Sequence, residues 1–268
     1  MVRPKKSLGQ HFLKDDNIAR KIAGYLDPSI PCVLEIGPGT GILTKYILQD
    51  PAFDLHVIEI DRESVAYLNE QFPSLRQRIL HGDFLGFDLS SLPHPCLAGR
   101  QAASGIQIIG NFPYNISSQI LFRVLDHRNI VDRVTGMFQK EVAERIASPP
   151  GSRKYGILSV LLQAFYRIDY LFTVNESVFF PPPKVKSAVI RLIRNGTDRL
   201  ACDEQLFFTV VKTTFNQRRK TIRNSLRTLV SVKPGEGIHL LELRPEQLSV
   251  EQFVELTRWV ASHSAKNS

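Results

Sequence analysis

Residues 32–41 read CVLEIGPGTG, a mainly apolar run followed by a turn with glycine at every second position. The apolar run predicts a buried strand, and the segment from Ile42 to Ile47 predicts a helix directly after the turn. Glycine allows the backbone to approach a ligand closely, and a helix N-terminus attracts polar or anionic groups. These ten residues therefore predict a strand, a ligand-binding turn and the start of a helix.

Strand and helix continue to alternate along the chain. Strands are expected at residues 55–61, shortly before Asp83, and at 106–110, with a helix at 62–72. This spacing is typical of a parallel, doubly wound α/β sheet, in which ligands bind beyond the carboxyl ends of the strands. The N-terminal residues 3–14 are too apolar for a free tail and are expected to pack back on this body.

Polar side chains stand at the ends of the successive strands, namely Glu59, Asp83 and Asn111. An acid about 20 residues beyond a glycine turn is placed to hold ribose hydroxyls. Together with the turn, these groups suit S-adenosylmethionine, whose ribose, adenine and methionine parts each need a partner. Ile42 occupies the sixth position of the pattern, where a nicotinamide-binding fingerprint needs glycine, so a dehydrogenase is disfavoured. The alternative is that both acids only cap loops.

The strand at 106–110 runs into the tetrapeptide Asn111-Phe112-Pro113-Tyr114. The amino group of adenine is a poor nucleophile, and two acceptors on its N–H bonds would free its lone pair. The Asn111 side-chain oxygen and the Phe112 carbonyl are candidates, because Pro113 holds residue 112 out of the helical region. Tyr114 offers a flat face to a base. An ordinary proline turn after a strand is the alternative interpretation.

Three loops have competing interpretations. The proline-rich segment 178–187 is stiff, so Phe179 could cover the second face of a flipped base opposite Tyr114, or it could simply be a core residue. Residues 148–155 are expected to form a mobile basic loop beside the site, either a contact for substrate phosphates or a plain linker. Residues 93–104 resemble a surface loop without chemistry.

The net charge of +8 and the pI near 9.5 are concentrated in one part of the chain. Residues 184–227 contain eleven Lys and Arg against three acids, a difference of eight, so the remainder is close to neutral. A clustered basic excess indicates a polyanionic partner, RNA or DNA first, although a solvated basic face is the plainer alternative. The pattern beyond residue 196 is helical, and Arg219, Arg223 and Arg227 are expected to share one helix face.

Several classes of protein are disfavoured. No apolar run approaches the roughly 18 residues that span a membrane, and no signal-peptide pattern follows the basic start. The three cysteines lack paired spacing, which predicts no disulfide framework and fits a reducing cytoplasm. The histidines form no HExxH-like cluster, so no metal is expected.

Seven motifs together resemble the KsgA/RsmA family of 16S ribosomal RNA adenine dimethyltransferases over nearly the whole chain. They are KSLGQHFL (6–13), EIGPGTG (35–41), NFPYN (111–115), QKEVAER (139–145), YGILSV (155–160), FFPPPKV (179–185) and FNQRRK (215–220). The chain departs from the family at Phe112, where Leu or Ile is more usual. The added bulk raises the question of how the site tolerates an already methylated amine.

The resemblance implies a Rossmann-like, class I S-adenosylmethionine-dependent methyltransferase domain at residues 1–195, with a mostly parallel seven-stranded sheet. It also implies a small all-α domain at 196–268 that binds RNA or the ribosome. The expected cofactor-binding residues are His11, Leu13, Gly37, Gly39, Glu59, Asp83, Phe84 and Asn111, with the acid at 59 on the ribose and the acid at 83 on the adenine amine. The expected catalytic residues are Asn111, Phe112, Tyr114 and Phe179.

The implied reaction places two methyl groups on N6 of each of two adjacent adenosines near the 3′ end of 16S rRNA, within the assembling 30S subunit. The protein is expected to be a cytoplasmic monomer. Two alternatives remain open at this point: a methyltransferase that acts on large-subunit rRNA or DNA adenine, and a ribosome-assembly factor for which RNA binding is the main task.

Overall fold

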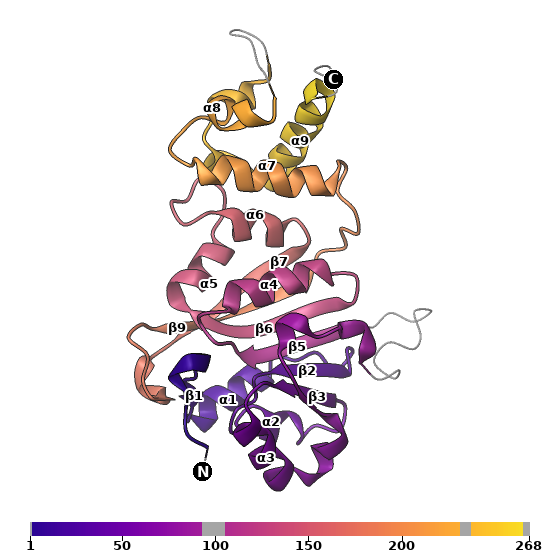
Figure 1. Cartoon of the computed structure of the whole chain (residues 1–268), viewed down its shortest axis with the longest axis vertical. Coiled ribbons are helices and arrows are strands. Elements are labelled where there is room, and N and C mark those ends of the chain that lie inside the picture. The colour runs from indigo at the N-terminus through magenta and orange to yellow at the C-terminus, as the bar shows by residue number, and fades with distance from the viewer. Residues whose placement is uncertain (1, 93–104, 231–236, 265–268) are drawn as a thin grey trace. The chain divides into compact units, whose positions relative to one another are not determined.

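The computed structural model describes residues 2–92, 105–230 and 237–264, so the expected surface loop at 93–104 lies outside the described residues. A seven-stranded sheet has the order β4-β3-β2-β5-β6-β9-β7 (Figure 1). Its strands are β2 Cys32–Ile36, β3 Asp54–Glu59, β4 Ile79–His81, β5 Ile106–Asn111, β6 Val131–Gln139, β7 Tyr166–Val174 and β9 Ser187–Arg194.

The sheet is mostly parallel, as predicted. β2 pairs in parallel with both β3 and β5, β3 pairs with β4 and β5 with β6, whereas β9 runs antiparallel to β6. From β2 the chain passes outward to β3 and β4, then returns to place β5 on the other side of β2. This reversal is the topological switch point of an open α/β sheet, where a crevice forms at the carboxyl ends of the strands.

Aspartate side chains cap the starts of three helices. Asp15 accepts hydrogen bonds from the N–H groups of Asn17 and Ile18 at the start of α1, and Asp61 and Asp203 cap α3 and α7 in the same way. The helices are α1 Asp16–Ala23, α2 Thr44–Ile47, α3 Arg62–Gln71, α4 Ser117–Asp126, α5 Lys140–Ala147, α6 Ile157–Gln163, α7 Glu204–Asn216, α8 Ile222–Ser225 and α9 Val250–Ser264.

The N-terminal segment packs on the body, as expected. Its strand β1, Phe12–Leu13, pairs antiparallel with β8, Phe179–Phe180, more than 160 residues away along the chain. The Lys5 ammonium lies 2.5 Å from Asp61 Oδ1 and 3.1 Å from Glu63 Oε1. Two kinds of contact, a strand pair and a pair of salt bridges, therefore hold this segment against the first unit of the chain.

The described chain forms two compact units. One extends to Ala143 and includes Ile168–Arg194; the other comprises Glu144–Arg167 and the chain from Asn195 onward. The second unit thus contains the expected C-terminal domain together with residues 144–167. Aromatic packing explains this, since buried Tyr155 contacts Phe215 edge-on at 6.2 Å between ring centroids.

Three local expectations need correction. Arg219, Arg223 and Arg227 do not share one helix, because α8 spans only Ile222–Ser225 and Arg227 belongs to a short 3₁₀ turn. Residues 148–155 are held rather than free: Gly151 N–H donates to Glu246 O at 2.7 Å within the second unit. Cys32 is disulfide-bonded, which contradicts the expectation that the cysteines form no disulfide, whereas Cys202 is free.

The described residues contain neither a membrane-spanning helix nor a metal-binding cluster. No helix among residues 2–92, 105–230 and 237–264 has the length and apolarity to cross a membrane. Over the same ranges, no group of three or more His, Cys, Asp or Glu side chains is arranged to hold a metal ion.

Candidate active site

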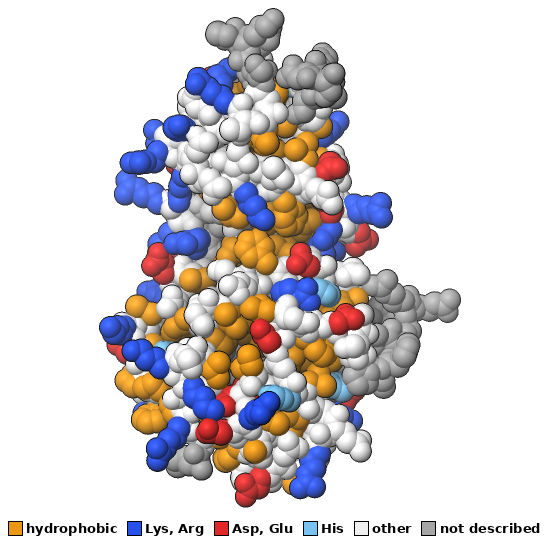
Figure 2. All heavy atoms as spheres, viewed as in Figure 1, with side chains coloured by type: hydrophobic (Ala, Val, Ile, Leu, Met, Phe, Trp, Pro, Cys, Tyr) orange, Lys and Arg blue, Asp and Glu red, His pale blue; other side chains and the backbone are white. Residues whose placement is uncertain are grey.

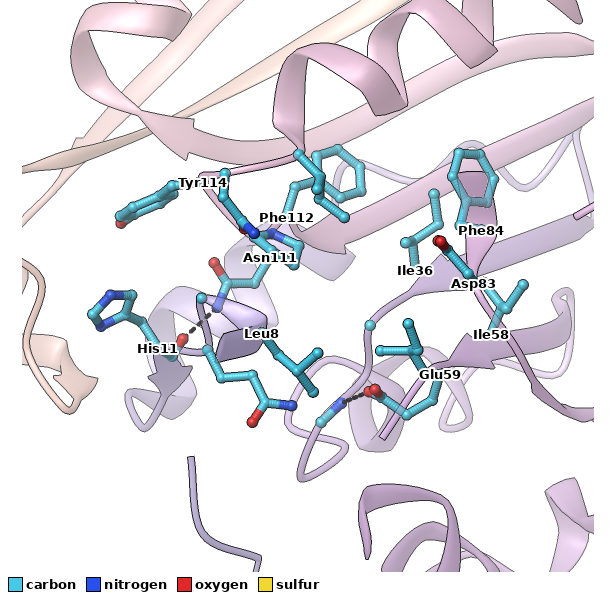
Figure 3. Close-up of a pocket in the computed structure, with 18 of the residues that line it drawn as sticks. Leu8, His11, Ile36, Ile58, Glu59, Asp83, Phe84, Asn111, Phe112 and Tyr114 are labelled. Atoms are coloured by element: carbon cyan, nitrogen blue, oxygen red, sulfur yellow. Dashed lines mark hydrogen bonds between the residues drawn. The ribbon is translucent and has the colours of Figure 1, made fainter. Parts of the chain in front are cut away.

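A pocket of about 950 Å³, including its open mouth, lies at the carboxyl ends of the central strands (Figure 3). Its walls come from the N-terminal segment, the glycine turn after β2, the end of β3, the turn after β4 and the tetrapeptide after β5. The lining includes nine residues that the sequence predicts for the site, namely His11, Gly37, Gly39, Glu59, Asp83, Phe84, Asn111, Phe112 and Tyr114. The topology therefore brings together residues spread over 100 positions.

The glycine turn is shaped by Gly37 and Gly39, whose φ angles are +65° and +56°. Side chains are disfavoured in this left-handed region, and a β-carbon at Gly39 would also lie 2.8 Å from Phe12 Cε1. No atom lies within 4 Å of the equivalent position at Gly37. The turn thus packs against the N-terminal segment on one side and leaves space for a ligand on the other.

Glu59 is fixed at the base of this turn. Its two oxygens accept hydrogen bonds from separate backbone groups, Gly39 N–H at 3.0 Å and Asp61 N–H at 2.9 Å. Burial raises the pKa of the Glu59 carboxyl, while the two backbone donors lower it. A carboxylate has about four acceptor sites, so this one can also receive hydroxyl donors from a ligand in the pocket.

The Asn111 amide is oriented by the N-terminal segment. Its Nδ2 donates to the His11 carbonyl at 2.8 Å (Figure 3). A carbonyl only accepts, so the NH₂ end of the amide faces His11, and Oδ1 remains available as an acceptor in the pocket. This is the orientation that the proposed contact with an exocyclic amine requires.

Tyr114 is held from two directions. Its hydroxyl lies 2.5 Å from Ser187 Oγ, and its ring stacks on His11 with 5.6 Å between the centroids and 27° between the planes. His11 Nδ1 in turn donates to Pro181 O at 2.7 Å. Burial raises the pKa of the Tyr114 phenol, so it remains protonated near neutral pH.

A second cavity shares His11 and Tyr114 with the first. It is bounded on its outer side by the proline-rich loop and contains two lysines, Lys6 and Lys184. Two cavities that share a stacked aromatic pair suit two ligands that must meet, and the lysines suit an anionic one.

Two predicted site residues do not lie in the pocket. Phe179 is only 1% exposed and packs in the core around Leu13, and the ring that stacks on Tyr114 is that of His11. Leu13 pairs with Phe179 across β1 and β8, and its side chain is buried in the same core. The strand pairing, which no local pattern announces, turns both side chains inward.

Two contributors escaped the sequence analysis. Ser187, fully buried at the start of β9, supports the Tyr114 hydroxyl. Lys5 ties the N-terminal segment to Asp61, two residues beyond Glu59. The basic residues before the motif at 6–13 include Lys5, but nothing in the sequence indicated its partner, because Asp61 lies 56 positions away.

Glu35, in the middle of β2, gives a testable pH dependence. It is 1% exposed, accepts a hydrogen bond from Thr44 Oγ1 at 2.6 Å, and burial raises its pKa from 4.5 to about 8. The folded protein therefore keeps a proton that the unfolded chain releases above pH 4.5, and stability falls as pH rises towards 8, by on the order of 1.4 kcal/mol per unit.

Thermal unfolding should be measured between about pH 5 and pH 8 for the wild type, Glu35→Gln and Glu70→Gln. Because Gln does not titrate, we expect the stability advantage of the wild type over Glu35→Gln to shrink as pH rises. Glu70 is exposed on α3, and its substitution should leave the curve unchanged. Parallel curves for the wild type and Glu35→Gln would contradict the raised pKa.

Comparisons with known proteins agree with this geometry. A family model described as "Ribosomal RNA adenine dimethylase" matches residues 1–262. A Parabacteroides distasonis protein named "Ribosomal RNA small subunit methyltransferase A" is 56% identical, with 100% of this chain and 98% of the relative covered.

Two solved structures share the fold. The crystal structure of a dimethyladenosine transferase from Plasmodium falciparum is 25% identical, with a TM-score of 0.72 over 92% of this chain and 96% of that one. The structure of the 23S rRNA methyltransferase ErmE is 24% identical, with a TM-score of 0.66 over 92% and 99% of the two chains. At that identity the second likeness concerns the fold alone.

Proposed function

The chain belongs to the ribosomal RNA adenine dimethylase family, and from this membership we propose that it dimethylates N6 of two adjacent adenosines near the 3′ end of 16S rRNA. The reaction class, methyl transfer from S-adenosylmethionine to adenine of small-subunit rRNA, follows from the family and the relatives. The observation that carries the chemistry is the Asn111 amide, whose NH₂ is occupied by the His11 carbonyl and whose Oδ1 is left as an acceptor.

The pocket residues fit S-adenosylmethionine. Glu59 supplies carboxylate oxygens for ribose hydroxyls, and Asp83 lines the pocket where an adenine amine needs an acceptor. Ile58 and Phe84 offer apolar surface to a ring, and the space beside Gly37 admits a backbone contact. When bound, the cofactor supplies an electrophilic methyl group on a positively charged sulfur, a good leaving group.

The chain's own contribution is to position the target amine and to accept its N–H bonds. Asn111 Oδ1 takes one N–H and the Phe112 carbonyl takes the other, which draws the nitrogen towards tetrahedral geometry and exposes its lone pair. Neither group removes a proton during the transfer, because the nitrogen becomes acidic only after it carries the methyl group, and the proton then passes to water. Catalysis then rests on orientation and acceptor placement.

Tyr114 supports the base rather than the proton transfer. With its pKa raised by burial, the phenol stays neutral and keeps its contact with Ser187. The second cavity, with Lys6 and Lys184 on its wall, suits the nucleotide that carries the target base. We assign the stacking contact to Tyr114 and His11 in place of Phe179.

The second unit offers a basic surface for RNA. Figure 2 shows Lys and Arg side chains along the part of the molecule that carries α7 and α8 in Figure 1. Arg218 and Arg223 face Glu246 and Glu242, whereas Arg219, Lys220 and Arg227 are exposed. Phosphate contacts from exposed basic side chains supply affinity that weakens with salt.

The double substitution Arg219→Ala/Lys220→Ala should weaken binding to small subunits about tenfold near 0.15 M salt. It should also reduce the slope of log Kd against log salt concentration by roughly 1.5, since two phosphate contacts are lost. Filter binding at several salt concentrations measures both. The charge-matched variant Arg62→Ala/Arg76→Ala, on and after α3, serves as control. Equal slopes for both variants would contradict this assignment.

The function is tested by incubating the protein with labelled S-adenosylmethionine and small ribosomal subunits from cells that lack the modification. Nucleoside analysis should show N6,N6-dimethyladenosine. Label appearing only in large-subunit RNA or DNA would keep the enzyme class and overturn the substrate. Subunit binding without any transfer would favour an assembly factor, the second candidate, which the basic surface of the second unit also suits.

We further propose that the substrate is the 16S rRNA within an assembling 30S subunit, and that the protein acts in the cytoplasm as a monomer without a metal. Comparison of naked 16S rRNA with partially assembled particles in the same assay tests the first of these statements.

A further inference from the structure

Two glycines form a bare patch on the sheet beside the site. Gly110 in β5 and Gly136 in β6 are register partners, so their missing side chains would point to the same face. Neither has a positive φ, so an alanine could adopt either backbone conformation. Glycine is therefore needed at these positions for space.

The ring of Phe112 fills this space. Phe112 lies two residues beyond Gly110, on the same face, and is 1% exposed. A β-carbon at Gly136 would overlap Phe112 Cε2 and lie 2.8 Å from Cδ2, and one at Gly110 would lie 2.7 Å from Cε1. Phe138 closes the slot edge-on, with 5.1 Å between ring centroids and 66° between planes. The extra bulk of Phe112 is thus absorbed by the sheet.

The seated ring also orients the peptide that carries the acceptor carbonyl. Phe112 N–H donates to Met137 O at 3.2 Å, so the residue is tied to β6 through its backbone as well as its ring. We propose that Gly136 is a positioning residue for methyl transfer: by leaving room for the Phe112 ring, it sets the Phe112 carbonyl against the target amine. This inference rests on the proposed function.

The variant Gly136→Ala should push the ring and its carbonyl out of place. We expect kcat for methyl transfer to small subunits to fall about 10- to 100-fold, since displacements near 1 Å cost this much. The Kd for S-adenosylmethionine, measured by calorimetry, should change less than about twofold, because Gly136 does not line the cofactor pocket. Gly86→Ala is the matched control, since no atom lies within 4 Å of its added β-carbon.

A second substitution at Phe112 distinguishes a positioning role of Gly136 from a general loss of stability. In Gly136→Ala/Phe112→Leu, the smaller side chain makes room for the added methyl, so kcat should return to within about threefold of Phe112→Leu alone. Melting temperatures of the four proteins give a readout independent of activity: the two substitutions should be less destabilising together than their sum. If Gly136→Ala alone does not fold, we expect the double variant to fold, because the smaller leucine side chain leaves room for the added methyl group.

Two results would overturn the role of Gly136. One is wild-type kcat in Gly136→Ala; the other is additive losses of stability and activity in the double variant while the wild type remains active. A wild-type protein that transfers no methyl group to small-subunit RNA would instead refute the proposed function, and the positioning role with it.

Discussion

Replacing Asn111 with alanine is expected to lower kcat for methyl transfer about 10³-fold, the loss typical when one preorganised hydrogen-bonding group at a reacting centre is removed. Only Oδ1 of Asn111 faces the pocket as an acceptor, because Nδ2 is engaged by the His11 carbonyl at 2.8 Å. Without it, the target amine keeps its lone pair in the ring. Single-turnover transfer to small subunits measures the effect.

Binding of the subunit should be nearly unchanged in Asn111→Ala, because the basic surface lies in the second unit. Asn175→Ala is the matched control: Asn175 is exposed and makes no capping bond with its side chain. The variant Asn111→Asp keeps an acceptor but sets a carboxylate oxygen against the His11 carbonyl, so we expect intermediate activity. Undiminished turnover in Asn111→Ala would sink the proposed role of the amide.

Replacing Glu59 with alanine is expected to raise the Kd for S-adenosylmethionine about 100-fold. Hydrogen bonds to a charged group are worth roughly 1.5–3 kcal/mol, and 2.7 kcal/mol corresponds to a hundredfold. The variant would lack the proposed carboxylate contacts with the ribose. Gly39 N–H, which donates to Glu59 Oε2 at 3.0 Å in the wild type, would also lose its acceptor. Both changes weaken the same turn. Isothermal titration of the free protein measures the Kd directly.

Glu59→Gln should bind more tightly than Glu59→Ala, because an amide oxygen can still accept from Gly39 N–H. Glu70→Ala, at an exposed position on α3, should leave the Kd unchanged. Thermal unfolding must accompany the titration, so that a folded variant with weak binding is distinguished from an unfolded one. A folded Glu59→Ala protein with wild-type Kd would remove this residue from the cofactor site.

Local sequence signals predicted most of the first unit. The run at 32–36 became β2 and the strand expected at 106–110 became β5, because buried strands are encoded within a few residues. The strand expected at residues 55–61 instead runs from Asp54 to Glu59 in β3. Boundaries move because pairing with a neighbouring strand extends or shortens what local propensity proposes.

Contacts between distant segments decide where two of the predicted site residues lie. Leu13 and Phe179 each had a plausible role on its own, yet pairing of β1 with β8 buries both. The sequence places residues 144–167 in the first domain, whereas the structure places them in the second unit, where Tyr155 packs on Phe215. Local patterns do not reveal this packing, because apolar side chains can meet at any separation along the chain.

The sequence by itself was sufficient for the sheet, the glycine turn, the polar groups at the strand ends and the family, since these depend on short-range periodicity and on contiguous motifs. The orientation of the side chains at the site was determined only by the tertiary structure. The Asn111 amide is oriented by a carbonyl 100 residues away, and the Phe112 ring by a glycine on the next strand. Hydrogen bonds and close packing act through space, so only the assembled sheet brings their partners within reach.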